Sequence, residues 1–162
     1  MFLLKALSFT TLAVLFSLIF IGGYVSASGV GLTCPDWPLC PQGLVPHQDF
    51  IIEYVHRSVA ATTGMLVIAT MAFTLKSKDA SRGMKIASII AAGAVIGQIT
   101  LGAIVIVERL HAILVTAHLG LGLVLFSMVL MTMLYAFKID KQRIETTTIS
   151  SNLSSTKDNN YK

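Results

Sequence analysis

Four long apolar stretches dominate the sequence, at about residues 6–25, 51–75, 86–107 and 112–137. A helix that crosses the hydrocarbon core of a bilayer needs about 20 predominantly apolar residues, and each stretch reaches that length. Only 12% of the 162 residues are charged, against about 25% in an ordinary soluble domain. The pattern therefore predicts an all-α integral membrane protein with four transmembrane helices, and it excludes a separate soluble catalytic domain.

The basic residues indicate how the helices are oriented across the membrane. Segment 76–85 and the chain after residue 138 are rich in Lys and Arg, whereas segment 26–50 contains neither. Basic loops stay in the cytoplasm, so both termini are predicted to be cytoplasmic and loop 26–50 extracytoplasmic, at the plasma membrane. The net charge of +4 is then a signal of topology, and no nucleic-acid partner is expected.

Short connections favour antiparallel neighbours, so residues 1–137 are predicted to form an up-down-up-down bundle. Residues 138–162 are polar and basic, with too little apolar surface to fold, and are expected to be a disordered cytoplasmic tail. The first stretch has a second interpretation as a cleaved signal peptide, because Lys5 precedes it and Val25-Ser26-Ala27 resembles a cleavage site. Its length favours a helix that stays.

Glycines in the third and fourth stretches have the spacing of helix-packing residues. Gly93 and Gly97 form a pair four residues apart, with Gly102 further on, and Gly120 and Gly122 lie in the fourth stretch. Small residues let helices approach closely in membranes, so we expect these glycines to be packing devices.

Ionisable groups inside a membrane are expensive and mark functional sites. Glu53, His56 and Arg57 lie about one turn inside the second stretch, and His118 lies one or two turns inside the fourth. Both stretches run inward from the outer face, so the histidines are expected at similar depth, facing each other. A six-coordinate haem needs one imidazole on each face. The alternatives are interhelical hydrogen bonding of each histidine or, with less support, a zinc site, which requires more ligands.

Glu53 and His56 are three residues apart and share a helix face. The carboxyl group is suited to proton transfer, to stabilising positive charge, or to orienting the imidazole. Arg57 either pairs with a carboxylate of the ligand, such as a haem propionate, or extends to the interface without a specific role. His111 is expected at the membrane surface and His47 in a solvated loop.

The outer loop contains the only cysteines, Cys34 and Cys40. On the oxidising side of a membrane such a pair can close a small disulfide ring. The ring would either rigidify a cap over the bundle or exchange electrons with a partner. Trp37, between the cysteines, is expected to anchor the loop at the interface.

These motifs together resemble the first half of haem A synthases. The likeness extends over about residues 8–137 and rests on the segments Gly22-Gly23-Tyr24-Val25, Gly29 to Cys40 (GVGLTCPDWPLC), Pro46, Glu53-Tyr54-Val55-His56-Arg57, Leu101-Gly102-Ala103 and Val115 to Gly120. The resemblance implies a membrane oxidoreductase that converts the methyl group of haem O to a formyl group by two hydroxylations and loss of water. The product, haem A, serves terminal oxidases.

The resemblance also implies roles for individual residues. His56 and His118 match the histidines that ligate haem iron, and Glu53 matches a carboxylate required for turnover. Cys34 and Cys40 match the outer-loop pair that forms a disulfide. The implied cofactor is haem b, with haem O as substrate. A haem O synthase and the assembly factors of the terminal oxidase are the implied partners, beside membrane lipid.

Most members of that family have eight spans in two four-helix halves, with the substrate haem in the first half and haem b in the second. The present sequence corresponds to one half, so the resemblance implies a homodimer, most simply about a two-fold axis. The same histidine pair would then ligate substrate in one protomer and cofactor in the other, or alternate between them.

Two other functions use the same residues differently. A four-helix b-type cytochrome or haem carrier would employ both histidines and give Glu53 no role. A quinone-linked, disulfide-generating enzyme would employ the cysteines, but such enzymes relay electrons through two cysteine pairs and this chain has one. That function also leaves the histidines unexplained.

Overall fold

The computed structural model describes residues 2–33 and 51–159, and within those ranges the regular elements are all helical. They are α1 (Phe2–Ser28), the short 3₁₀ helix η1 (Val30–Leu32), α2 (Ile51–Lys76), α3 (Arg82–Val107) and α4 (Ala112–Asn159). Each of the four α-helices is long and apolar enough to cross a membrane. The prediction of an all-α, four-span membrane protein is confirmed.

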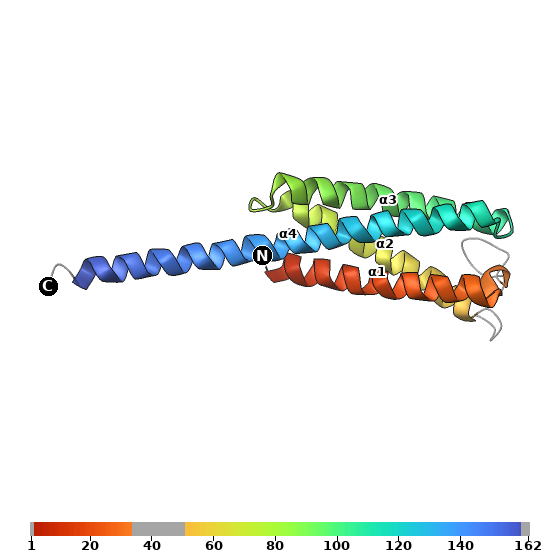
Figure 1. Ribbon diagram of the computed structural model, residues 1–162, viewed down its shortest axis with the longest axis horizontal. Helices are drawn as coiled ribbons and strands as arrows, with labels where there is room; N and C mark the ends of the chain where they lie inside the picture. The colour runs from red at the N-terminus through yellow and green to blue at the C-terminus, as the bar shows by residue number, and fades with distance from the viewer. Residues whose placement is uncertain (1, 34–50, 160–162) are drawn as a thin grey trace.

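The four helices form a ring in which neighbours run antiparallel (Figure 1). Helices α1 and α3 each pack against α2 and α4, so α2 and α4 are diagonal to one another. We call the end where α1 ends, α2 begins and α3 turns into α4 the loop end, and the opposite end the tail end. Both termini lie toward the tail end, with α4 projecting well beyond it (Figure 1).

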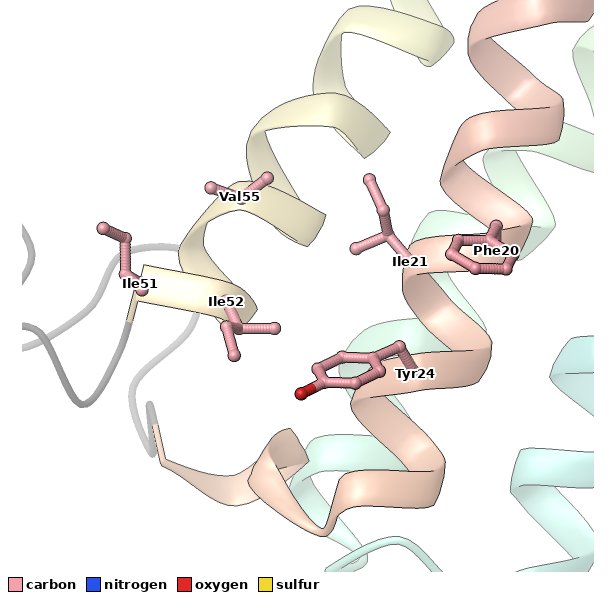
Figure 2. A pocket seen from close by; sticks show the side chains of 6 residues that line it. All are labelled: Phe20, Ile21, Tyr24, Ile51, Ile52 and Val55. Atoms are coloured by element: carbon pink, nitrogen blue, oxygen red, sulfur yellow. The ribbon is translucent and has the colours of Figure 1, made fainter.

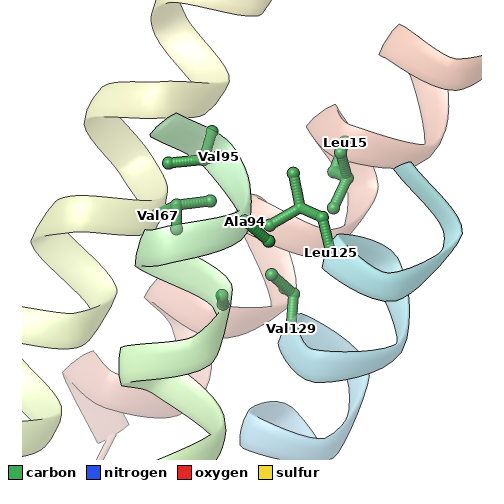
Figure 3. Packing of buried hydrophobic residues seen from close by; sticks show 7 residues of the cluster. Leu15, Val67, Ala94, Val95, Leu125 and Val129 are labelled. Carbon is green, nitrogen blue, oxygen red and sulfur yellow. The ribbon is translucent and has the colours of Figure 1, made fainter. Parts of the chain in front are cut away.

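Each helix contributes side chains to one buried core (Figure 3). Its members are mostly small or branched apolar residues: Leu15, Val67, Ala91, Ala94, Val95, Leu125 and Val129. Larger apolar side chains point outward instead; Phe16 is 62% exposed and Leu123 63%. A soluble protein rarely exposes so much apolar surface, whereas lipid covers it in a membrane. The chain is therefore a multi-pass membrane protein.

Polar contacts add to this packing between helices. The buried hydroxyl oxygens of Thr11 and Thr70 are 2.9 Å apart and join α1 to α2. At the tail end the ammonium group of Lys5 contacts the carboxylate of Asp140, and it also lies 5.6 Å from the ring centroid of Phe137. These contacts hold the first turns of α1 against α4.

The glycines do not all act as expected. A Cβ atom at Gly97 would lie 3.1 Å from Leu121 Cδ2, so this glycine does admit a packed side chain from α4. Gly93 and Gly120, in contrast, have no other side chain of the described chain within 4 Å of that position. The expectation that they pack within the bundle is wrong, because these two positions face away from the neighbouring helices.

The chain beyond residue 137 also differs from the expectation of a disordered tail, because α4 continues to Asn159. Residues 141–150 are all exposed, and a tertiary contact from this part is the exposed pair of Arg143 and Asp79, with nitrogen and oxygen 3.7 Å apart. Helix growth from an existing helix is far easier than nucleation. The pair of Lys141 and Glu145, with nitrogen and oxygen 3.9 Å apart, adds a weak local contact.

Truncation of the core should weaken the bundle more than truncation of its outer surface. Leu15 is 2% exposed and Leu3, on the same helix, is 59% exposed. We expect Leu15→Ala to lower the free energy of unfolding by an amount near the lower end of the usual loss of about 2–5 kcal/mol. In a membrane, the part of that loss that comes from transfer of the side chain to water is absent. SDS titration in mixed micelles measures this, with Leu3→Ala as the control. Equal losses in both variants would contradict the assignment of the core.

Candidate functional site

The two intramembrane histidines lie near the loop end on the diagonal helices α2 and α4. His56 is five residues into α2 and His118 six residues into α4. At 1.5 Å per residue these offsets are about 7.5 Å and about 9 Å along the two helices. Both imidazoles therefore lie at similar depth near the loop end, on helices that are diagonal in the bundle. The structure thus places the two residues that the sequence pairs at the same end of the bundle.

Neither histidine is satisfied by the rest of the described chain. The Nδ1 atoms of His56 and His118 are buried, and neither has a hydrogen-bond partner among the residues that the structure describes. Burying a polar nitrogen without a partner costs about 1–3 kcal/mol, and such groups are rare in native structures. Two unsatisfied imidazoles of this kind fit residues whose hydrogen-bonding or ligand groups come from outside the chain.

Each imidazole lies beside a glycine on the preceding helix. A Cβ atom built on Gly22 would be 3.0 Å from His56 Cε1, and one built on Gly102 would be 3.3 Å from His118 Cε1. Gly22 is in α1 and Gly102 in α3, so the hairpins α1–α2 and α3–α4 use the same arrangement. A side chain in either place would make an unusually tight contact, and the ring would have to move by a few tenths of an ångström.

The carboxylate of Glu53 is almost fully buried, with 2% of the residue exposed. Arg57 Nη2 donates to Oε1 at 2.6 Å, and Thr33 Oγ1 donates to Oε2 at 3.1 Å. A buried charge requires a partner and additional hydrogen bonds, and Glu53 has both. Arg57 was expected at a ligand carboxylate or at the interface; in the structure its guanidinium group contacts Glu53.

Thr33 was missed by the sequence analysis, and its position depends on the turns at the loop end. Gly29, with a φ of 75°, lets the chain leave α1 and enter η1. Leu110 packs over η1, since a Cβ at Gly31 would lie 3.3 Å from Leu110 Cδ1. Leu110 itself has a φ of 62°, a conformation that costs a non-glycine residue about 1–3 kcal/mol. The α3–α4 turn thus holds η1, and with it Thr33, over Glu53.

Gln98 of α3 is a further polar residue that the sequence analysis missed. Its Oε1 is buried and has no hydrogen-bond partner within residues 2–33 and 51–159. Its Nε2 lies 2.7 Å from where a Cβ of Gly122 would stand, one helical turn along α4 from His118. The available signal was that Gln98 is the one Asn or Gln in the four apolar stretches; a search limited to ionisable groups overlooks it.

An apolar groove of about 300 Å³ lies between α1 and α2 at the loop end (Figure 2). Its lining consists of Phe20, Ile21, Tyr24, Ile51, Ile52 and Val55. The Tyr24 hydroxyl is the only side-chain polar group in that lining, and neither histidine contributes to it. The groove therefore offers apolar contact and does not coincide with the histidine pair.

The structure describes the position of only some of the other predicted residues. His111 is exposed at the start of α4, as expected for a surface residue. Cys34, Cys40, Trp37 and His47 lie outside the described residues, so their predicted roles stay predictions. Within the described part of the chain no three His, Cys, Asp or Glu side chains gather as a metal site would require, which leaves the zinc alternative without support there.

Known proteins resemble this chain over most of its length. A family model described as Cytochrome oxidase assembly protein (COX15-CtaA) matches residues 47–155, which include Glu53, His56 and His118. A protein named Heme A synthase from Bacillus licheniformis is 36% identical over 140 residues, or 84% of this chain and 46% of the relative.

Two further relatives carry the same name. The protein from Geobacillus kaustophilus is 33% identical over 83% of this chain and 43% of its own length. The protein from Staphylococcus aureus is 32% identical over 72% of this chain and 39% of its own length. The chain thus spans less than half the length of these relatives. The match extends over most of the chain and contains the helices that carry both histidines, and the protein belongs to the cytochrome oxidase assembly protein family (COX15-CtaA).

Proposed function

We propose that the protein is a haem A synthase that oxidises the methyl group of haem O to a formyl group. The observation that carries the proposal is a pair of histidines on diagonal helices whose buried Nδ1 atoms have no hydrogen-bond partner among the described residues. Two histidines at similar depth on diagonal helices suit the two faces of a haem better than any other common group. The names of the relatives supply the reaction.

In this proposal His56 and His118 would hold the haem through its iron. The haem would supply the redox chemistry, and the chain supplies position and charge. The conversion passes electrons from the methyl carbon to an external oxidant, adds oxygen and releases protons, so positive charge or a proton has to be accommodated near the ring. Glu53 is the group suited to this, because it is one turn from His56 and its carboxylate is held at both oxygens.

Arg57 and Thr33 act through Glu53. The guanidinium group balances the carboxylate charge, and the threonine hydroxyl fixes the second oxygen. The predicted contact of Arg57 with a haem propionate is compatible with this position, because a guanidinium group presents five N–H donors. The contact of Arg57 with a haem propionate is therefore part of the proposal.

The membrane orientation and the cysteine pair belong to the proposal as well. The distribution of basic residues places the loop end on the extracytoplasmic side of the plasma membrane and both termini in the cytoplasm. A disulfide between Cys34 and Cys40 would then follow Thr33 directly in the chain. It would fix the segment that leads into the Thr33–Glu53 contact or pass electrons to the site.

Loss of the Glu53 charge should slow haem A formation without weakening haem binding. We expect Glu53→Gln to keep haem bound with an unchanged absorption spectrum and to lower the rate of haem A formation by about 100-fold or more, as for a removed general acid or base. Glu145→Gln, at an exposed site on α4, is the matched control. Haem A is measured by mass after extraction. Unchanged turnover in Glu53→Gln would contradict the role of Glu53, whereas haem bound by the unmodified protein without any haem A formed would favour the alternative function, a haem carrier or b-type cytochrome without chemistry.

Removal of either proposed ligand should change the coordination of the haem iron. We expect His56→Ala and His118→Ala to convert a six-coordinate, low-spin spectrum into a five-coordinate, high-spin one. His111→Ala, at an exposed position, should leave the spectrum as it is. Absorption and electron paramagnetic resonance spectra of the purified protein provide the measurement. A low-spin spectrum that survives both single variants would rule out this ligand pair.

A homodimer would provide separate sites for haem O and for haem b. We expect the detergent-solubilised protein to contain two chains and two chemically different haems. Native mass spectrometry gives the number of chains, and mass analysis of the extract identifies the haems. Full turnover by a monomer with one haem would exclude the dimer while leaving the proposed reaction in place.

A further inference from the structure

We infer that Gly22 and Gly102 are positioning residues that set the ring orientation of His56 and His118 for ligation of one haem. The inference rests on the proposed haem binding and goes beyond it, because it assigns the orientation of both ligands to the helices α1 and α3, which carry neither histidine. Each glycine provides space that any other residue would fill.

The two contacts share one geometry. From the Cβ position of Gly22, His56 Cε1 is at 3.0 Å, Nδ1 at 3.6 Å and Nε2 at 3.9 Å. From the Cβ position of Gly102, His118 Cε1 is at 3.3 Å and Nδ1 at 3.9 Å, and Nε2 is not within 4 Å. In both rings the Cε1 edge faces the glycine and Nε2 is the more distant nitrogen.

Two nearby glycines have no such contact, so the contact depends on where each glycine faces in the bundle. Gly23 follows Gly22 directly in α1, yet nothing lies within 4 Å of its Cβ position. Gly120, two residues beyond His118, is equally open. These two positions supply controls that carry the same change in composition and helix propensity.

An added methyl group should displace the rings. Real Cβ atoms almost never approach another atom closer than 3.0 Å, and contacts of 3.0–3.4 Å require the neighbour to give way by a few tenths of an ångström. The imidazole is attached to its own helix by short bonds, so it yields by turning. Groups that orient a metal-ligating histidine typically change metal affinity by about 10–100-fold when they are altered.

The first test is titration of the full-length, detergent-solubilised protein with iron protoporphyrin IX. We expect the unmodified protein, Gly23→Ala and Gly120→Ala to bind it in a six-coordinate, low-spin state. Gly22→Ala and Gly102→Ala should bind it about tenfold or more weakly and with a high-spin component in the electron paramagnetic resonance spectrum. Equal affinity and spin state in all four variants would overturn the inference. Absence of binding by the unmodified protein would instead overturn the proposed function, and this inference with it.

A second test needs no haem and examines the contact between the glycine and the imidazole ring directly. Gly22→Ala is introduced into the chain with His56 and into a His56→Ala background, and the melting temperatures of the haem-free proteins are compared. We expect the substitution to lower the melting temperature only when the ring is present, because alanine otherwise favours a helix over glycine. The pair Gly102 and His118 is tested in the same way. An identical shift in both backgrounds would show that no ring contact exists.

Discussion

The buried carboxylate of Glu53 is the interaction around which the loop end is arranged. In an apolar bundle a charge of this kind survives only with a counter-charge and further hydrogen bonds. The counter-charge is Arg57, from the next turn of α2, and a hydrogen bond comes from Thr33, directly after η1. Leu110 of the α3–α4 turn covers η1, and its strained, left-handed conformation is tolerated because it brings that side chain over η1. The carboxylate thereby ties the α1–α2 connection to α2, and Leu110 joins the α3–α4 turn to the same end of the bundle.

Buried polar atoms of the histidines also require partners, but their Nδ1 atoms find none within the described chain. Most hydroxyl groups inside the helices, Thr74 excepted, are satisfied locally, as when Thr63 Oγ1 donates to the Val59 carbonyl at 2.8 Å, and Glu53 is satisfied by its neighbours. An imidazole is too large and too rigid to bond to its own backbone in this way, so the buried Nδ1 atoms of His56 and His118 depend on groups outside the described chain. Placing them on diagonal helices gives a ligand access from both sides.

Much of this arrangement follows from the sequence, because hydropathy fixes the spans and the helical rise fixes depth within them. The matched depth of His56 and His118 needs only the start of each span and the knowledge that both helices begin at the same end. The role of a particular glycine cannot be obtained in this way. Gly93 and Gly102 look alike in sequence, yet one faces away from the bundle and the other faces His118, since helix rotation and register depend on how all four helices pack. The contact of Thr33 with Glu53 likewise spans 20 positions of sequence, and the helical extension of α4 depends on growth from a packed helix.

Within the described residues, one four-helix unit brings together both imidazoles, both glycines beside them and the buried carboxylate. The relatives are more than twice as long as their matching part. A second copy of the bundle would therefore contribute a second site of the same construction. Because both sites would be built from the same residues, a substrate site and a cofactor site would differ only in the haem that each one binds.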